Sequence, residues 1–288
     1  MRISSLFEQK KTVLSFEIFP PKRTSPIETI YKTLEELKDL KPDFISVTYG
    51  AGGNAGDTAT SDIAREIKHR YGIEPLAHLT CVNDTKQEIA QVLNRLENSS
   101  IENILALRGD INPNIPPKKE FRYASELVEY IRMRGGFHIS GACYPEGHID
   151  ASDMEEDIRN LKHKVETGVE HLISQLFFDN AFFYSFLDRA RAAGITVPIE
   201  AGIMPVTNKA QIERMVTLCG ASLPPKFAKM MQRFEHSPEA LRDAGIAYAV
   251  DQIVDLISQG VDGIHLYTMN NPYIARRIHE CISGLIEA

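Results

Sequence analysis

Residues 12–19 read TVLSFEIF, and two prolines follow them directly. Successive side chains of a β-strand point to opposite faces, so a strand here would have two very different sides. One side would carry the apolar residues Leu14, Phe16 and Ile18, and the other would carry Val13, Ser15, Glu17 and Phe19. The first side suits a covering layer of helices. The second, which becomes polar toward its end, suits the inside of a closed sheet.

Seven more segments of this kind follow along the chain. Each is short and apolar, and turn residues such as GAGG, GD, PE or MP come after it. The complete set of expected strands is 12–19, 43–49, 75–81, 103–108, 138–144, 171–178, 197–203 and 262–267. Amphipathic segments separate them, and two of these begin with a capping-box pattern, at Ser25-Pro26-Ile27-Glu28 and at Ser152 to Glu155. Gly168 is placed to end the second of these helices.

Strands that alternate with helices form parallel sheets through crossover connections. Eight such units, in a chain of 288 residues without a linker, predict an α/β fold: a (βα)8 TIM barrel with residues 1–288 as one catalytic domain. The alternative is an open, doubly wound sheet.

The faces of two further strands favour the barrel. In 264–267, alternation separates Ile264 and Leu266 from His265 and Tyr267. In 103–110 it separates Leu105 and Leu107 from Ala106, Arg108 and Asp110, and we expect the two leucines to face the helices.

Composition excludes several classes of protein. A net charge of -7 argues against a nucleic-acid binder. The N-terminal residues contain no apolar signal core, and no apolar run approaches the roughly 18 residues of a membrane span. The four cysteines form no CxxC pair, which argues against a disulfide framework and a zinc site. We expect a reduced cytoplasmic protein without a metal.

Polar residues gather near the ends of seven expected strands. They are Glu17, Thr48, His78, Arg108, Asp110, Tyr144, His148, Gln175 and Tyr267. An open sheet would spread these residues along an edge, whereas a barrel brings them together in one pocket. Glu17 lies among apolar neighbours that favour the neutral acid, as a general acid requires, although an interior ion pair is the alternative.

Two glycine-containing segments have different implications. Arg108-Gly109-Asp110 places a cation and an anion two positions apart, and Gly109 would let the backbone approach a flat ligand; a structural ion pair is the alternative. GAGGNAGD at 50–57 does not fit the GxGxxG spacing of dinucleotide-binding loops, and we interpret it as a flexible loop.

Eight motifs, one at each strand end, carry a family resemblance. They are SFEIFPPK, ISVTYGAGG, HLTC, LALRGD, YPEGH, QLFFD, GIMPV and HLYTMN. In this order, over residues 12–275, the chain resembles methylenetetrahydrofolate reductase of the bacterial, catalytic-domain-only type. The resemblance implies a flavin-dependent barrel of one-carbon metabolism and methionine biosynthesis. It would use FAD to reduce 5,10-methylenetetrahydrofolate to 5-methyltetrahydrofolate, with NADH as the expected donor in a ping-pong reaction.

The resemblance also implies residue roles. Glu17 matches the general acid, and Asp110 matches the carboxylate that stabilises the iminium. The matched folate-binding positions are Glu17, Gln175, Gln211 and Tyr267. The matched FAD-binding positions are Thr48, His78, Arg108, Gly109, Asp110, Tyr123, Ala124, Tyr144, His148, Ala151, Asp157, Asn160 and Lys164.

The chain departs from the family pattern at three positions. Asn271 stands where an arginine is common, Met215 where an aromatic residue is common, and His163 where an arginine is common beside the flavin. We expect a homo-oligomer that binds small-molecule substrates. One alternative is a flavin and folate redox subunit that receives electrons from a partner protein instead of NAD(P)H. Another is a pterin-binding methyl-transfer barrel without flavin.

Overall fold

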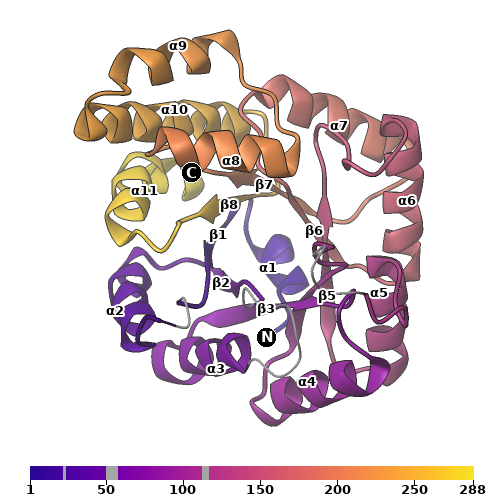
Figure 1. The fold of residues 1–288 in the computed structure, drawn as a ribbon. Helices are drawn as coiled ribbons and strands as arrows, with labels where there is room; N and C mark the ends of the chain where they lie inside the picture. Colours follow the sequence, from indigo (N-terminus) through magenta and orange to yellow (C-terminus); the bar gives the residue numbers. More distant parts are fainter. Residues whose placement is uncertain (22–23, 50–57, 112–116) are drawn as a thin grey trace.

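The computed structural model describes residues 1–21, 24–49, 58–111 and 117–288, without the side chains of 209, 211, 214 and 218. The glycine-rich segment 50–57 lies outside the described residues. Eight parallel strands close into a barrel in the order β1 to β8 (Figure 1). They are β1 (Val13–Ile18), β2 (Phe44–Val47), β3 (Glu74–Thr80), β4 (Asn103–Leu107), β5 (His138–Cys143), β6 (His171–Ser174), β7 (Ile199–Ile203) and β8 (Gly263–Tyr267). Each overlaps one expected segment, which confirms the TIM barrel and excludes the open sheet.

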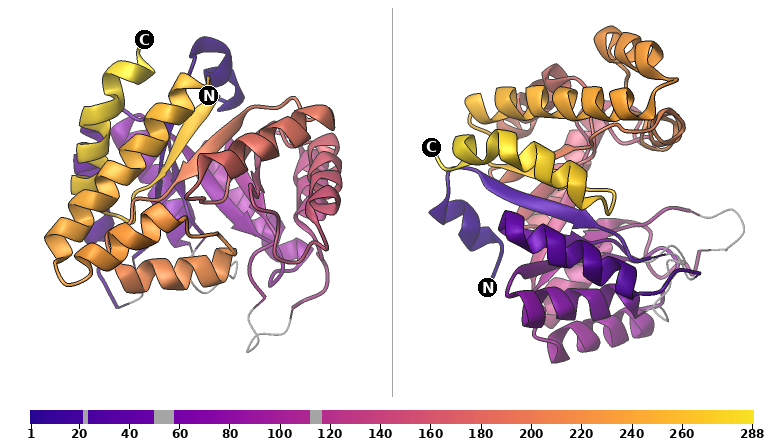
Figure 2. Two further views of the ribbon diagram at one scale, coloured as in Figure 1. Left: turned by 90° about the horizontal axis from the view of Figure 1, so that it is seen from above. Right: turned by 90° about the vertical axis from the view of Figure 1, so that its left-hand side faces the viewer.

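Helices surround the barrel (Figure 2). They are α1 (Ser4–Gln9), α2 (Glu28–Leu37), the 3-10 turn η1 (Lys38–Leu40), α3 (Ala59–Tyr71), α4 (Lys86–Asn98), α5 (Ala124–Arg134), α6 (Met154–Thr167), α7 (Asn180–Ala192), α8 (Lys209–Cys219), α9 (Pro225–Phe234), α10 (Pro238–Ser258) and α11 (Pro272–Ile286). Two short helices, α8 and α9, thus stand between β7 and α10. Within the described residues, no helix is both long enough and apolar enough to cross a membrane.

The N-terminal ends of the strands are closed by α1, which lies across the centre of the barrel in Figure 1. The backbone N–H of Ile3 donates to Asn103 Oδ1 at 3.0 Å, and the N-terminal ammonium of Met1 contacts Glu74 and Glu102. Buried apolar side chains fill this end: Ile3, Leu6, Val13, Phe44, Leu76, Leu105 and Ile173. The opposite end, where the strands terminate, is therefore the end available to a ligand.

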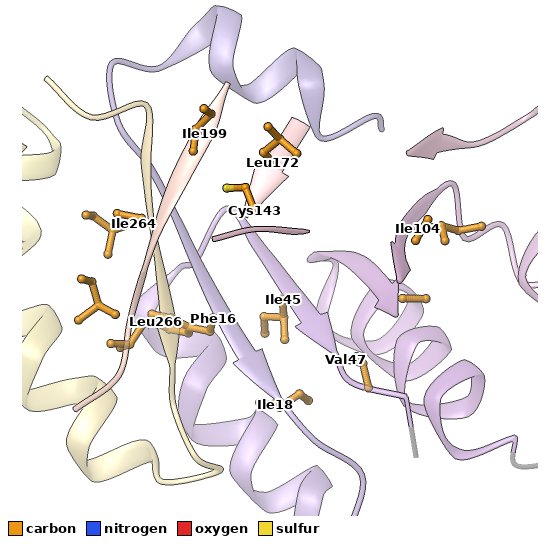
Figure 3. Packing of buried hydrophobic residues seen from close by; sticks show 14 of the residues in the cluster. Phe16, Ile18, Ile45, Val47, Ile104, Cys143, Leu172, Ile199, Ile264 and Leu266 are labelled. Carbon is orange, nitrogen blue, oxygen red and sulfur yellow. The ribbon is translucent and has the colours of Figure 1, made fainter. Parts of the chain in front are cut away.

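Alternation along the strands was predicted correctly for β1 and β8 and wrongly for β4. Figure 3 shows Phe16, Ile18, Ile264 and Leu266 among the side chains that pack toward the helices. Ile104 belongs to the same cluster, whereas Leu105 joins the interior cluster with Leu107 packed against it. The register explains this difference, because Leu105 pairs with the inward-facing His78 of β3. Both faces of β4 are apolar, so composition alone could not separate them.

The helix starts differ from the two capping boxes expected. Helix α2 begins at Glu28, and no side chain caps it, so the box at Ser25 does not form. Helix α6 is capped by Asp153, whose carboxylate accepts from the N–H of Glu156 at 2.8 Å, one residue later than the expected serine. Asp is as good an N-cap as Ser. Gly168 ends α6 as expected.

We predict that Gly245→Ala destabilises the fold. A methyl group at Gly245 in α10 would lie 1.6 Å from the carbonyl oxygen of Val206, and this backbone contact can be relieved only by moving α10 away from β7. We expect a loss of at least ~3 kcal/mol in the free energy of unfolding, measured by urea denaturation. The control is Gly284→Ala in α11, where nothing lies within 4 Å. It should stabilise by about 0.5–1 kcal/mol. Equal effects of the two changes would contradict the packing argument.

Candidate active site

A cavity of about 550 Å³ opens beside the carboxyl ends of β4 and β5, between these strands and helices α5 and α6. Nine of the thirteen positions matched to FAD binding line it: Arg108, Tyr123, Ala124, Tyr144, His148, Ala151, Asp157, Asn160 and Lys164. They come from strand ends and from the helices that follow, so no single stretch of sequence forms the cavity. Its size is that of a pocket for a drug-sized ligand or a cofactor.

Arg108 does not pair with Asp110. Its guanidinium contacts the carboxylate of Asp150 at 2.8 Å, and this hydrogen bond lowers the pKa of Asp150. Asp110 is exposed at the end of β4. Arg108 therefore does not form the ion pair considered within the Arg108-Gly109-Asp110 segment. It pairs with Asp150, in the loop that follows the neighbouring strand β5.

Three more cavity residues have pKa values changed by burial. Burial lowers the pKa of Lys164, whose ammonium donates to the carbonyl oxygen of Ala142, and raises the pKa of Asp157. Burial also lowers the pKa of His148, whose Nδ1 accepts from the backbone N–H of Asp150 at 3.0 Å. An anionic group in this cavity would compensate the burial of the lysine and lie near Arg108. The cavity therefore suits a ligand that carries phosphates and hydroxyl groups.

Four of the matched positions lie outside the cavity lining: Thr48, His78, Gly109 and Asp110. Gly109 adopts a φ of +86°, and a Cβ there would lie 2.9 Å from the Cβ of Thr80. The glycine is thus required by the fold as well as by any ligand. The carbonyl oxygen of Thr48 accepts from the Thr60 hydroxyl at 2.9 Å, which ties the end of β2 to α3.

Glu17 lies between two imidazoles. Its Oε2 is 3.5 Å from Nε2 of His78 and 3.5 Å from Nε2 of His265, and its side chain is 18% exposed. Its backbone carbonyl accepts from the Thr268 hydroxyl at 2.6 Å. Burial lowers the pKa of His78 to about 4, so this imidazole is neutral near pH 7. The surroundings of Glu17 are therefore more polar than its sequence neighbours suggested.

Besides Glu17, two matched folate positions have described side chains. The hydroxyl of Tyr267 donates to the carbonyl oxygen of Ser174 at 2.8 Å, and burial raises its pKa well above the ordinary value. A Cβ at Gly202 would lie 2.9 Å from the ring of Tyr267, so the glycine makes room for it. Gln175 is half-buried, and its Oε1 accepts from the N–H of Leu176 at 2.9 Å. The third, Gln211, lies in α8, and its side chain is outside the described residues.

The structure shows where the three departures from the family pattern lie. Asn271 caps α11, and its side chain accepts from the N–H of Ile274 at 3.3 Å. Met215 packs partly buried against the apolar cluster under α8 and α9. His163 is exposed on α6 and lines the outer part of the cavity. None of the three is among the residues described above as contacting Glu17, which are His78, His265 and Thr268.

Sequence reasoning missed four residues of the site. Asp150 pairs with Arg108, and His265 contacts Glu17. Ser15 contacts His265, and Glu200 contacts Ser15. The alternation along β1 and β8 had placed Ser15 and His265 on the inner face. This alternation could have predicted that the two residues meet, because inward-facing polar residues of neighbouring strands lie at the same level of the barrel. Nothing in the local sequence indicates that Asp150 reaches Arg108.

We predict that Tyr267→Phe costs ~1 kcal/mol or more of unfolding free energy, because it leaves the buried carbonyl of Ser174 without its donor. Tyr273→Phe is the control. Tyr273 is 43% exposed, and its hydroxyl accepts from Arg277 at 3.0 Å, so its loss should cost less than ~0.5 kcal/mol. Urea denaturation of the two variants tests the difference. A Tyr267 variant as stable as the control would remove the structural role given to this hydroxyl.

Comparison with known proteins gives one family. The family model described as methylenetetrahydrofolate reductase matches residues 2–283. The chain is 36% identical to "5,10-methylenetetrahydrofolate reductase" of Pectobacterium carotovorum subsp. carotovorum, with 94% of this chain and 90% of that protein covered. It is 37% identical to the protein of that name from Escherichia coli (strain K12), with 89% of this chain and 86% of that protein covered.

A plant relative and a solved structure extend the comparison. "Methylenetetrahydrofolate reductase (NADH) 1" of Arabidopsis thaliana is 33% identical, with 93% of this chain and 48% of that protein covered. A structure titled "Uncharacterized protein from Clostridium thermocellum binds two copies of 5-methyl-5,6,7,8-tetrahydrofolic acid" matches all of this chain with a TM-score of 0.68. At 14% identity and full coverage of both chains, it supports the fold alone. The chain therefore belongs to the methylenetetrahydrofolate reductase family of oxidoreductases.

Proposed function

We propose that this chain, as one catalytic domain, reduces 5,10-methylenetetrahydrofolate to 5-methyltetrahydrofolate, with FAD as cofactor and NADH as electron donor. The observation that carries the proposal is the position of Glu17 between His78 and His265, at the same end of the barrel as the 550 Å³ cavity. The family supports the substrate, and the relative with NADH in its name supports the donor. The two half-reactions would share the mouth in a ping-pong sequence.

The cavity residues fit FAD. Lys164 and Arg108 supply positive charge for the pyrophosphate, and Asp157 and Asn160 supply polar groups for ribose hydroxyls. The buried lysine, whose ammonium donates to a backbone carbonyl, is the feature that an anion would complement. When bound, FAD supplies hydride acceptance from the nicotinamide and hydride donation to the folate.

Glu17 provides the proton for the folate half-reaction. As a carboxylic acid it protonates N10 of the bridged folate, the bond from the methylene carbon to N10 breaks, and an iminium remains at N5. The imidazole of His78, 3.5 Å from the carboxyl group, adds no fixed positive charge there, since burial keeps this ring neutral near pH 7.

Asp110 stabilises the cation that forms. It is exposed at the end of β4, close enough to the mouth to influence the pKa values of Tyr144 and Cys219. A carboxylate fixed at the site of a developing positive charge lowers the barrier to its formation. Gln175, Gln211 and Tyr267 would contact the pterin and the remainder of the folate.

The first experiment is a visible spectrum of the purified protein, followed under anaerobic conditions by NADH and then by methylenetetrahydrofolate. We expect a yellow protein that bleaches with NADH and regains its colour with the folate. A yellow protein that NADH leaves unchanged would favour the redox subunit that takes electrons from a partner protein. A colourless protein that does not take up added FAD would overturn the flavin assignment and leave pterin binding without redox chemistry.

We predict that Glu17→Gln retains FAD and its reduction by NADH but slows flavin reoxidation by the folate by about 10²–10⁴-fold, the usual contribution of a general acid. Glu36→Gln is the control, because Glu36 is exposed on α2. Stopped-flow absorbance of each half-reaction gives the measurement. Unchanged reoxidation in the Glu17 variant would remove it from the acid role.

We also predict that Asp110→Ala slows the folate half-reaction by about 10²-fold, the scale of one lost electrostatic contact in a transition state. It should leave the amount of FAD retained nearly unchanged, since Asp110 does not line the cavity. Asp188→Ala, on the surface of α7, is the matched control. Weaker retention of FAD, together with a normal folate half-reaction in the protein that still holds FAD, would reassign Asp110 to cofactor binding.

A further inference from the structure

A continuous series of polar contacts runs from Glu17 into the barrel. His265 Nε2 lies 3.5 Å from Glu17 Oε2, and His265 Nδ1 lies 2.7 Å from the hydroxyl of Ser15. The same hydroxyl lies 2.9 Å from Oε1 of Glu200. Ser15, His265 and Glu200 are completely buried. These contacts place a second carboxyl group, on β7, at the inner end of a short chain that begins at the proposed acid.

The barrel leaves space specifically for Glu200. A Cβ at Gly263, the residue that pairs with Glu200 across β7 and β8, would lie 2.7 Å from the Glu200 Cγ. Any larger residue at 263 would displace this side chain. On its other side, Glu200 Oε2 lies 3.0 Å from Nε2 of His171, whose Nδ1 lies 2.9 Å from the hydroxyl of Ser140. Oε1 of the carboxyl group thus has a hydrogen bond to Ser15 on β1, and Oε2 has the imidazole of His171 on β6 close by.

The number of hydrogens in this chain is informative. Three contacts join Glu17, His265, Ser15 and Glu200, and each needs one hydrogen. A neutral imidazole and a serine hydroxyl supply two. The third is a mobile proton, which can sit on Glu17, on His265 or on Glu200 without leaving any contact unsatisfied. When this proton moves between Glu17 and Glu200, each contact keeps one hydrogen, and only the donor and the acceptor of that contact change places.

We propose that Glu200 is a proton store that recharges Glu17 through Ser15 and His265. The inference rests on the proposed function, in which Glu17 gives a proton to the folate. It adds a positioning residue on β7, remote from the mouth, to the acid on β1.

The electrostatic surroundings agree with a stored proton. Burial raises the pKa of Glu200 to about 8, an effect that His265 and Ser15 partly oppose and that Asp43 and Asp262 reinforce. On the β6 side, burial lowers the pKa of His171 to about 3, so this ring does not act as a permanent cation beside the carboxylate. Farther along, burial lowers the pKa of His138 on β5 to about 3.

The transfer is balanced. The cycle begins with the mobile proton on Glu200 and a further proton on the Glu17 carboxyl group. After Glu17 gives this further proton to the folate, its carboxylate takes the hydrogen of His265 Nε2, and Nδ1 takes the hydroxyl hydrogen of Ser15. The serine oxygen then takes the carboxyl proton of Glu200. One proton moves from Glu200 to Glu17, and no electrons are transferred. The 3.5 Å contact at Glu17 must shorten for the first step, as catalytic contacts do when ligand binds. When the folate leaves, the 18% exposure of Glu17 lets solvent return a proton by the same route.

The test is Glu200→Gln. The amide cannot store the proton. It also lacks the negative charge that, after the transfer, helps to keep the proton on Glu17 and His265. In the wild type, the rate of the folate half-reaction should stay high up to about pH 8. In the variant, the pH at which this rate falls should be lower by about one unit. At pH 6 the two rates should agree within about twofold, and flavin reduction by NADH should match at every pH. Damage to the fold would instead slow both half-reactions.

Two further variants keep the test decisive. Ser15→Ala breaks the chain with Glu200 in place and should cause the same shift, and the double variant should shift no further. His138→Gln is the matched control: it is buried on β5, and its ring nitrogens have no hydrogen-bond partner among the described residues. It should leave the pH limit unchanged. A Glu200 variant with the wild-type limit, or a double variant whose shifts add, would overturn the proposal.

An infrared measurement separates this inference from the proposed function. The wild-type protein at pH 7 should show the carbonyl stretch of a buried carboxylic acid, and Glu200→Gln should lack it. This readout needs neither flavin nor folate. A wild type without the band overturns the proton store even if folate reduction is normal. A wild type with the band but without folate reduction overturns the proposed function while Glu200 still holds its proton.

Discussion

Closure of the parallel sheet is the constraint on which the rest of this structure depends. Once eight strands form a barrel, every second residue of each strand must share a narrow interior with residues of its neighbours at the same level. A side chain therefore meets partners that are distant in sequence. Ser15 and Glu200 are 185 residues apart, and Glu17 and His265 are 248 apart, yet they are in contact. Because side chains alternate along a strand, a residue's position in the strand decides whether its side chain faces this interior or the helices.

The interior is divided along the barrel axis. Helix α1 and the apolar side chains beside it, such as Phe44 and Leu76, fill the end where the strands begin. Polar side chains occupy the levels above, and here burial alone would be unfavourable. The carboxyl group of Glu200 is accommodated because the Ser15 hydroxyl lies 2.9 Å from its Oε1 and because Gly263 leaves it room. Apolar packing at one end thus gives the polar levels a rigid base.

Local composition predicted the eight strands, and the family resemblance supplied the nine residues that line the cavity. Sequence patterns failed where the outcome depends on distant contacts. Leu105 faces inward because of its register with His78, and both faces of β4 are equally apolar. Arg108 selects Asp150 rather than Asp110 because the loop after β5 folds over the end of β4. Glu200 lies in a segment, PIEAGI, that gives no sign of where its side chain would find a hydrogen bond.

Hydride transfer and proton transfer make different demands on an active site, and the proposed function places them in different parts of the barrel. The cavity that suits FAD draws on β4, β5, α5 and α6, and its charged groups, such as Lys164 and Arg108, are suited to binding and orientation. The acid and its chain draw on β1, β7 and β8, on the other side of the mouth. Because the two groups share no residue, a change in the proton chain can leave the cavity intact. This separation makes each proposed half-reaction an internal control for the other.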